Sequence, residues 1–138
     1  MGDAEGPSGM HVDHVGVATE DAESLADLYT ELLDAPVAHE EGFDGLRVVF
    51  LDLGGDGYVE FLEPDEEGTT IGRYLENEGG GIHHVAFATD DIEAALETAR
   101  EAGVELIDED PRDGAWGHDV AFLHPKDTGG ALIEFVEH

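Results

Sequence analysis

The sequence predicts an α+β fold of two tandem β-α-β-β-β modules that form a curved mixed sheet. The first observation behind this prediction is a repeat: HVDHVGVATEDAESL at 11–25 returns as GIHHVAFATDDIEAA at 81–95. The second is that each copy opens with an apolar run and then changes to helical spacing of its apolar residues. The third is that two further apolar runs follow each copy. Together they indicate a duplicated half-module with approximate two-fold symmetry.

Each copy of the repeat predicts a strand followed by an amphipathic helix. Asp21 and Asp91 precede the helical patterns, where a carboxylate accepts from free backbone amides and complements the helix dipole. The apolar positions at helical spacing are Leu25, Leu28, Tyr29, Leu32 and Leu33 in the first copy, and Ile92, Ala95, Leu96, Ala99 and Ala102 in the second. One helix per module is therefore expected.

The later runs predict one β-hairpin in each module. VVFL at 48–51 and VEFLE at 59–63 flank a turn DLGGDG, whereas VAFL at 120–123 and IEFVE at 133–137 flank HPKDTGG. A short strand near Val37 or Val104 completes each module.

The expected organisation is one domain over 10–138 after a Gly-, Pro- and acid-rich flexible leader at 1–9. Its half-modules span about 10–67 and 80–138. The linker 68–79 is expected to be helical in its middle.

The charge of the chain is extreme: 35 acidic residues stand against five Lys and Arg, giving a formal net charge of −30. At about 1 M salt the Debye length falls to roughly 3 Å, so self-repulsion is screened and a halophilic protein is expected. A disordered acidic interaction protein is the alternative, but such chains lack this regular apolar spacing. Nucleic acid and anionic membranes are poor partners for this charge.

The sequence contains no cysteine, no charged-then-apolar signal peptide and no apolar run of membrane-spanning length. Thiolate metal sites and disulfides are therefore excluded. A cytoplasmic protein is expected.

Two histidines and two glutamates recur at matched positions inside apolar strands: His14 and Glu60, then His84 and Glu134. In so acidic a chain, a single glutamate is best interpreted as an ordinary surface residue. These glutamates, however, lie in apolar strands, and a buried unpaired carboxylate is costly. Four residues at matched positions of a repeat are therefore not accidental. They predict a divalent metal site for Co, Mn, Ni, Fe or Zn, and four ligands leave two octahedral positions open for a substrate. His83 should point away from His84 and pack or support it.

The segments GIHHVAFATDDIEAAL, LIDEDPRDGAWG and AFLHPKDTGGALIEFVE resemble the vicinal oxygen chelate (glyoxalase-like) superfamily, and within it the methylmalonyl-CoA epimerase family. The resemblance runs from about residue 11 to the end. It implies a metal-dependent epimerase of (R)- and (S)-methylmalonyl-CoA, an acyl-CoA substrate and a homodimer. Carried over residue by residue, the family's metal ligands also fall on His14, Glu60, His84 and Glu134.

The implied reaction removes the α-proton and stabilises an enolate, with a base on one face and an acid on the other. Glu134 and Glu60 are expected to be this acid/base pair as well as ligands. A further base proposed for the family corresponds to Val48 here and is not carried over. Glu41 and Asp44, expected in the nearby loop, are the next candidates.

The resemblance also suggests substrate contacts. Lys126, the only lysine, is expected to contact the substrate's carboxylate or phosphates, the alternative being a screened surface lysine. The amides of Gly129 and Gly130 are expected to help hold the carboxylate. Coenzyme A contacts are possible at Arg47, Arg73 and Arg112.

Three other activities use this fold and stay open as alternatives. Lactoylglutathione lyase has a similar ligand pattern, but the HPK block favours the epimerases. An antibiotic-binding protein needs no metal, which does not fit two ligands from each half. An extradiol dioxygenase requires two histidines and one carboxylate, so a fourth ligand argues against it.

Overall fold

The computed structural model describes residues 10–138, so the leader expected at 1–9 lies outside the described residues. The chain divides into two compact units. The first unit is His14–His83, and the second combines residues 10–13 with His84–His138. The segment expected as a linker, 68–79, therefore belongs to the first unit.

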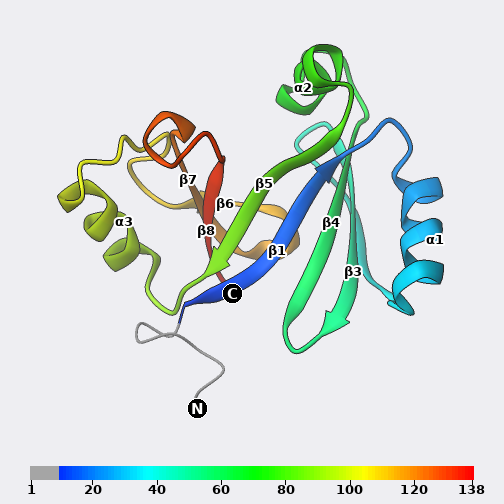
Figure 1. The fold of residues 1–138 in the computed structure, drawn as a ribbon, viewed down its shortest axis with the longest axis horizontal. Coiled ribbons are helices and arrows are strands. Elements are labelled where there is room, and N and C mark those ends of the chain that lie inside the picture. The colour runs from blue at the N-terminus through cyan, green and yellow to red at the C-terminus, as the bar shows by residue number, and fades with distance from the viewer. Residues whose placement is uncertain (1–9) are drawn as a thin grey trace. The chain divides into compact units, whose positions relative to one another are not determined.

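The first unit has the predicted β-α-β-β-β order followed by a helix (Figure 1). Its elements are β1 (His11–Ala18, of which the unit holds His14 onward), α1 (Ala22–Leu33), β2 (Val37–Phe43), β3 (Leu46–Gly54), β4 (Gly57–Pro64) and α2 (Thr70–Glu78). The strand order is β2-β3-β4-β1. β1 is parallel to β4 and the other neighbours are antiparallel, so the sheet is mixed as predicted.

The second unit repeats this plan with a much shorter second strand (Figure 1). Its elements are β5 (Gly81–Ala88, of which the unit holds His84 onward), α3 (Ile92–Glu101), β6 (Arg112–Asp113), the 3-10 turn η1 (Ala115–Gly117), β7 (Asp119–Leu123), the 3-10 turn η2 (Pro125–Asp127) and β8 (Ile133–Glu137). The strand order is β5-β8-β7-β6, with β5 parallel to β8.

The prediction of a strand near Val104 is wrong. In the described residues this region makes only an isolated bridge between Leu106 and Leu123. The Asp108 carboxylate accepts the Phe122 N–H at 2.8 Å, in place of a backbone carbonyl. Pro111 then lacks an N–H to give to a ladder, so regular pairing begins only at Arg112.

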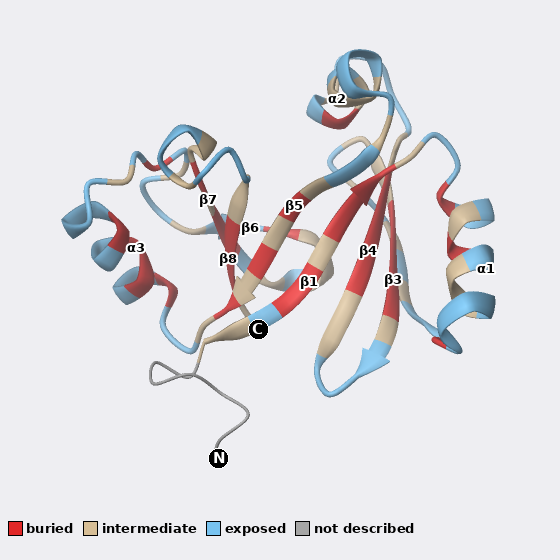
Figure 2. Ribbon diagram, in the orientation of Figure 1, coloured by how far each residue is buried: buried red, intermediate tan, exposed pale blue. Residues whose placement is uncertain are grey.

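In each unit a helix packs on one face of the sheet, and both helix and strands contain buried residues (Figure 2). In the first unit Ala22 and Ala26 of α1 pack with Val49, Leu51 and Phe61. The matching cluster of the second unit comprises Ile92, Ala95, Leu96, Ala99, Leu106, Ala121, Leu123 and Phe135. Because side chains alternate along a strand, the residues between these positions face the opposite side of each sheet.

The helices of the repeat begin as predicted. Asp21 accepts the Ser24 N–H at 3.0 Å and Asp91 accepts the Ala94 N–H at 3.1 Å. A second acceptor comes from the last strand of each module: Glu63 binds the first amide of α1 at 2.7 Å, and Glu137 binds the first amide of α3 at 2.8 Å. The repeat thus extends to the way each helix is anchored on its sheet.

The two hairpins differ at their turns. Asp56 adopts a positive φ of 65° in the Gly-rich β3–β4 turn, which joins two antiparallel strands as predicted. Between β7 and β8 the chain forms η2 instead of a tight turn, and the Pro125 carbonyl accepts the Gly130 N–H at 2.9 Å. Across residues 10–138, no helix has both the length and the apolar character needed to cross a membrane.

Replacing Asp91 by alanine should lower the free energy of unfolding by about 1 kcal/mol, because α3 loses its capping acceptor. Urea unfolding followed by circular dichroism at about 1 M salt measures this with charge repulsion screened. Asp90→Ala is the matched control, since it removes the same charge from the exposed neighbour. Its cost should stay below about 0.5 kcal/mol. An equal loss in both variants would contradict the capping role.

Candidate metal centre

The first unit holds a buried histidine–glutamate pair on the sheet face opposite α1. His14 lies on β1 and Glu60 on β4, where Gly16 is the register partner of Glu60. The His14 Nε2 and Glu60 Oε1 atoms are 3.2 Å apart. Each residue is only 5% exposed. The polar residue that interrupts each apolar strand pattern is thus buried on the sheet face opposite the helix.

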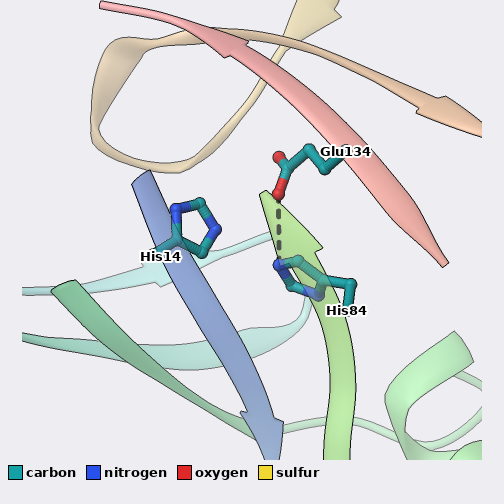
Figure 3. A group of neighbouring side chains, drawn as sticks. All are labelled: His14, His84 and Glu134. Carbon is teal, nitrogen blue, oxygen red and sulfur yellow. Dashed lines mark ion pairs between the residues drawn. The ribbon is translucent and has the colours of Figure 1, made fainter. Parts of the chain in front are cut away.

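The second unit holds the same pair in the equivalent strands. Figure 3 shows His84 on β5 and Glu134 on β8 pointing toward one another, with Nε2 and Oε1 3.1 Å apart. Ala86 is the register partner of Glu134, as Gly16 is of Glu60. His84 is 5% exposed and Glu134 is 6% exposed. Distance and burial therefore match between the two modules.

A phenylalanine supports each histidine, and the sequence interpretation missed both. The Phe50 and His14 rings meet edge to face with centroids 5.6 Å apart, and Phe122 meets His84 in the same way at 5.7 Å. Phe50 lies directly opposite Glu60, and Phe122 directly opposite Glu134. The alignment of VVFL with VAFL contained this signal. Each ring restricts the orientation of its histidine.

These pairs fit the requirements of a divalent metal site. Neutral imidazole offers a nitrogen lone pair and carboxylate offers oxygen lone pairs, a mixed set without thiolate that suits first-row divalent metals. His14, His84 and Glu134 each offer one buried ligand atom. A cation beside them would offset the cost of burying the carboxylates.

The sheet face that carries each His–Glu pair, here called the site face, also carries a charged residue on the edge strand of its unit, β2 or β6. This residue is acidic in the first unit and basic in the second. In the first unit His39 Nε2 lies 2.6 Å from Glu41 Oε1, and the His39 ring packs at a tilt against Phe50, 6.4 Å between centroids. Glu41 lies in strand β2 and not in a loop as expected. Asp44 is in the turn after β2, at a φ of 53°.

In the second unit Arg112 occupies the corresponding place. Its guanidinium carbon lies 5.4 Å from the Phe122 ring centroid. The Arg112 Nε donates to Asp108 at 3.1 Å. Arg47 and Arg73, the other two candidate coenzyme A contacts, donate to Glu40 and to the Gly68 carbonyl.

The predicted substrate contacts lie in and after η2. Lys126 is exposed and binds Glu105 at 2.5 Å. Their hydrogen bond, with the attraction of opposite charges, lowers the pKa of Glu105 and raises the pKa of Lys126. Gly129 and Gly130 both have positive φ, 75° and 86°. The Gly130 N–H is committed to the turn through Pro125.

Two further histidines have structural partners. His83 meets Tyr74 of α2 edge to face at 5.0 Å, which supports the packing role expected for it. His138 lies 2.5 Å from the buried Asp13 carboxylate and packs against the His118 ring at 3.9 Å. No sequence pattern predicts the cluster of Asp13, His118 and His138, because its members are far apart along the chain.

Comparisons with known proteins agree with this arrangement. Residues 13–122 match the model of the Glyoxalase/Bleomycin resistance protein/Dioxygenase superfamily. The chain is 39% identical over 130 residues to an ethylmalonyl-CoA/methylmalonyl-CoA epimerase of Cereibacter sphaeroides, covering 91% of this chain and 96% of that protein.

Solved structures extend the match to the fold. A methylmalonyl-CoA epimerase from Mycobacterium tuberculosis aligns with a TM-score of 0.86 at 35% identity, over 91% of this chain and 86% of that one. A methylmalonyl-CoA epimerase in complex with methylmalonyl-CoA and NH4+ aligns at 0.87 and 35%, over 93% and 94%. The predicted fold class and the predicted resemblance are confirmed.

Divalent metal should stabilise the protein by about 2.7 kcal/mol when its concentration is 100 times Kd. Glu134→Ala should lose more than half of this metal-dependent gain, measured as the change in unfolding free energy between chelated and metal-loaded protein. Glu101→Ala removes an exposed carboxylate from α3 and should keep the full gain. Equal gains in both variants would show that Glu134 is not a ligand.

Proposed function

Because the chain belongs to the Glyoxalase/Bleomycin resistance protein/Dioxygenase superfamily, we propose that it interconverts (R)- and (S)-methylmalonyl-CoA. The observation that carries the proposal is the matched pair of buried His–Glu contacts, one in each module. A relative supports the proposal: an ethylmalonyl-CoA/methylmalonyl-CoA epimerase is 39% identical to this chain over 91% of its length.

The four residues His14, Glu60, His84 and Glu134 would hold one divalent metal ion. Each module supplies only two ligands, fewer than the four to six that first-row metals take, so neither pair is a complete site by itself. When bound, the metal would supply positive charge toward the thioester and carboxylate oxygens, where negative charge develops as the α-proton leaves. Co, Mn, Ni, Fe and Zn all suit these ligands.

The carboxylates of the two modules would move the proton. Epimerisation needs one group to remove the α-proton and another to return a proton from the opposite face. Glu134 and Glu60 are equivalent residues of the duplicated fold, which suits such complementary roles. Their burial excludes bulk water, so an abstracted proton stays close to the substrate. The edge-to-face phenylalanines hold the histidines that flank these carboxylates.

Lys126, Gly129 and Gly130 would contribute to substrate binding. Lys126 lies in a turn, exposed and paired with the exposed Glu105, in a protein with few cations to attract the substrate's phosphates or carboxylate. Both glycines have positive φ, a backbone conformation that residues with a Cβ atom rarely adopt, so the turn before β8 depends on them.

The setting proposed for the enzyme follows from its charge and family. A net charge of −30 suits a salt-rich cytoplasm, where repulsion between acidic side chains is screened. We further propose a homodimer, as the family resemblance implies. Neither nucleic acid nor membrane is an expected partner.

Exchange of the α-hydrogen of methylmalonyl-CoA in deuterated water tests the function. The metal-loaded protein at about 1 M salt should catalyse exchange, and a chelator should stop it. Glu134→Gln and Glu60→Gln should each lower kcat by about 100-fold or more, as expected for loss of a general acid or base.

Glu101→Gln is the matched control and should retain full activity. The hemithioacetal of methylglyoxal and glutathione serves as the second substrate, since its turnover would indicate a lactoylglutathione lyase. Absence of metal-dependent exchange with methylmalonyl-CoA would overturn the proposed function.

Lys126→Gln should raise KM for methylmalonyl-CoA about two- to fivefold with little change in kcat, since an exposed ionic contact is weak and screened. Methylmalonyl-pantetheine lacks the nucleotide phosphates, so its KM should not change if Lys126 contacts them. A rise with both substrates would assign Lys126 to the carboxylate instead. No rise with either would show that it is a surface lysine.

A further inference from the structure

The two modules differ in charge at one equivalent position of their site faces. Val48 of β3 aligns with Val120 of β7 in the repeat. Glu41 lies directly opposite Val48, and Arg112 lies directly opposite Val120. Opposed residues of antiparallel strands share a face. The duplicated fold therefore presents a carboxylate in one module where it presents a guanidinium in the other.

The Arg112 guanidinium contacts the phenylalanine that supports its unit's candidate ligand, whereas Glu41 is linked to the equivalent phenylalanine only through His39. In the first unit Glu41 pairs with His39, which packs against Phe50. In the second unit the Arg112 guanidinium lies over Phe122, whose edge-to-face partner is His84. Arg112 and the candidate metal ligand His84 therefore contact the same aromatic ring.

Arg112 is oriented but not enclosed. Asp108 accepts from its Nε and is itself fixed by the Phe122 N–H. Its side chain remains 48% exposed. A guanidinium held through Nε can still present its two terminal nitrogens to a carboxylate.

The substrate of the proposed function is chemically unsymmetrical where the site is nearly symmetrical. The α-carbon of methylmalonyl-CoA lies between a neutral thioester and a charged carboxylate. Matched His–Glu pairs cannot distinguish these two ends. A cation beside one pair, without an equivalent cation beside the other, can do so.

We propose that Arg112 binds the free carboxylate of the substrate beside the His84–Glu134 pair of its own unit. This inference rests on the proposed function and refines it: Arg112 recognises the carboxylate, which leaves Lys126 to the phosphates. The charge of Arg112 fixes which end of the malonyl unit lies beside the His84–Glu134 pair.

Propionyl-CoA tests the proposal, because it keeps every phosphate of methylmalonyl-CoA and lacks only the carboxylate. Arg112→Gln should raise KM for methylmalonyl-CoA at least tenfold, about the effect of losing a charge-assisted hydrogen bond. The inhibition constant of propionyl-CoA should change less than about twofold. Arg112→Lys keeps the charge without the planar fork and should give an intermediate KM.

Arg100→Gln is the matched control. Arg100 lies on α3, on the opposite side of the same unit's sheet, and is 38% exposed with acidic partners of its own. Its loss should change neither constant. Should Arg112→Gln fail to fold, Arg112→Lys carries the test through the same comparison.

Equal weakening of both ligands, or an unchanged KM, would overturn the role of Arg112. A wild-type protein that exchanges no α-hydrogen of methylmalonyl-CoA would instead overturn the proposed function. The two failures are therefore distinguishable.

Discussion

The contact between a buried histidine and a buried glutamate on neighbouring parallel strands is the interaction on which the chemistry of each module depends. Burying two ionisable groups in an otherwise apolar sheet is costly unless they satisfy one another or share a cation. This arrangement occurs twice, at 3.2 Å for His14 and Glu60 and at 3.1 Å for His84 and Glu134. Repetition of so unfavourable an arrangement supports the proposal that these residues bind a metal ion.

The strand alternation separates stability from chemistry. The helix-covered face of each sheet is apolar, and the core between sheet and helix includes the fully buried Phe61 of β4 and Leu96 of α3. The opposite face carries the polar pairs and the rings of Phe50 and Phe122. A one-residue slip of β4 or β8 would exchange the two faces and place a carboxylate beneath a helix. The register of these strands is therefore fixed by the core and used by the site.

The sequence was sufficient to predict the elements and ligand candidates that the duplication marks, because two copies reinforce a pattern that one copy leaves ambiguous. His14 aligns with His84, and Asp21 with Asp91, on the sequence alone. Prediction from the sequence failed where the two copies of the repeat diverge. The strand expected near Val104 is absent from the described fold because the Asp108 side chain takes the Phe122 amide. Glu41 was misplaced in a loop because its acidic neighbours hide the period of β2.

The carboxylates that anchor α1 and α3 also bear on how the chain folds. The acceptor of the first α1 amide lies 41 residues later in the sequence, and that of α3 lies 45 residues later. Each helix can nucleate locally through its own aspartate, but its docked start requires the last strand of its module. During synthesis α3 would therefore wait for β8 to emerge. Such distant contacts raise the contact order and slow the final assembly of each module.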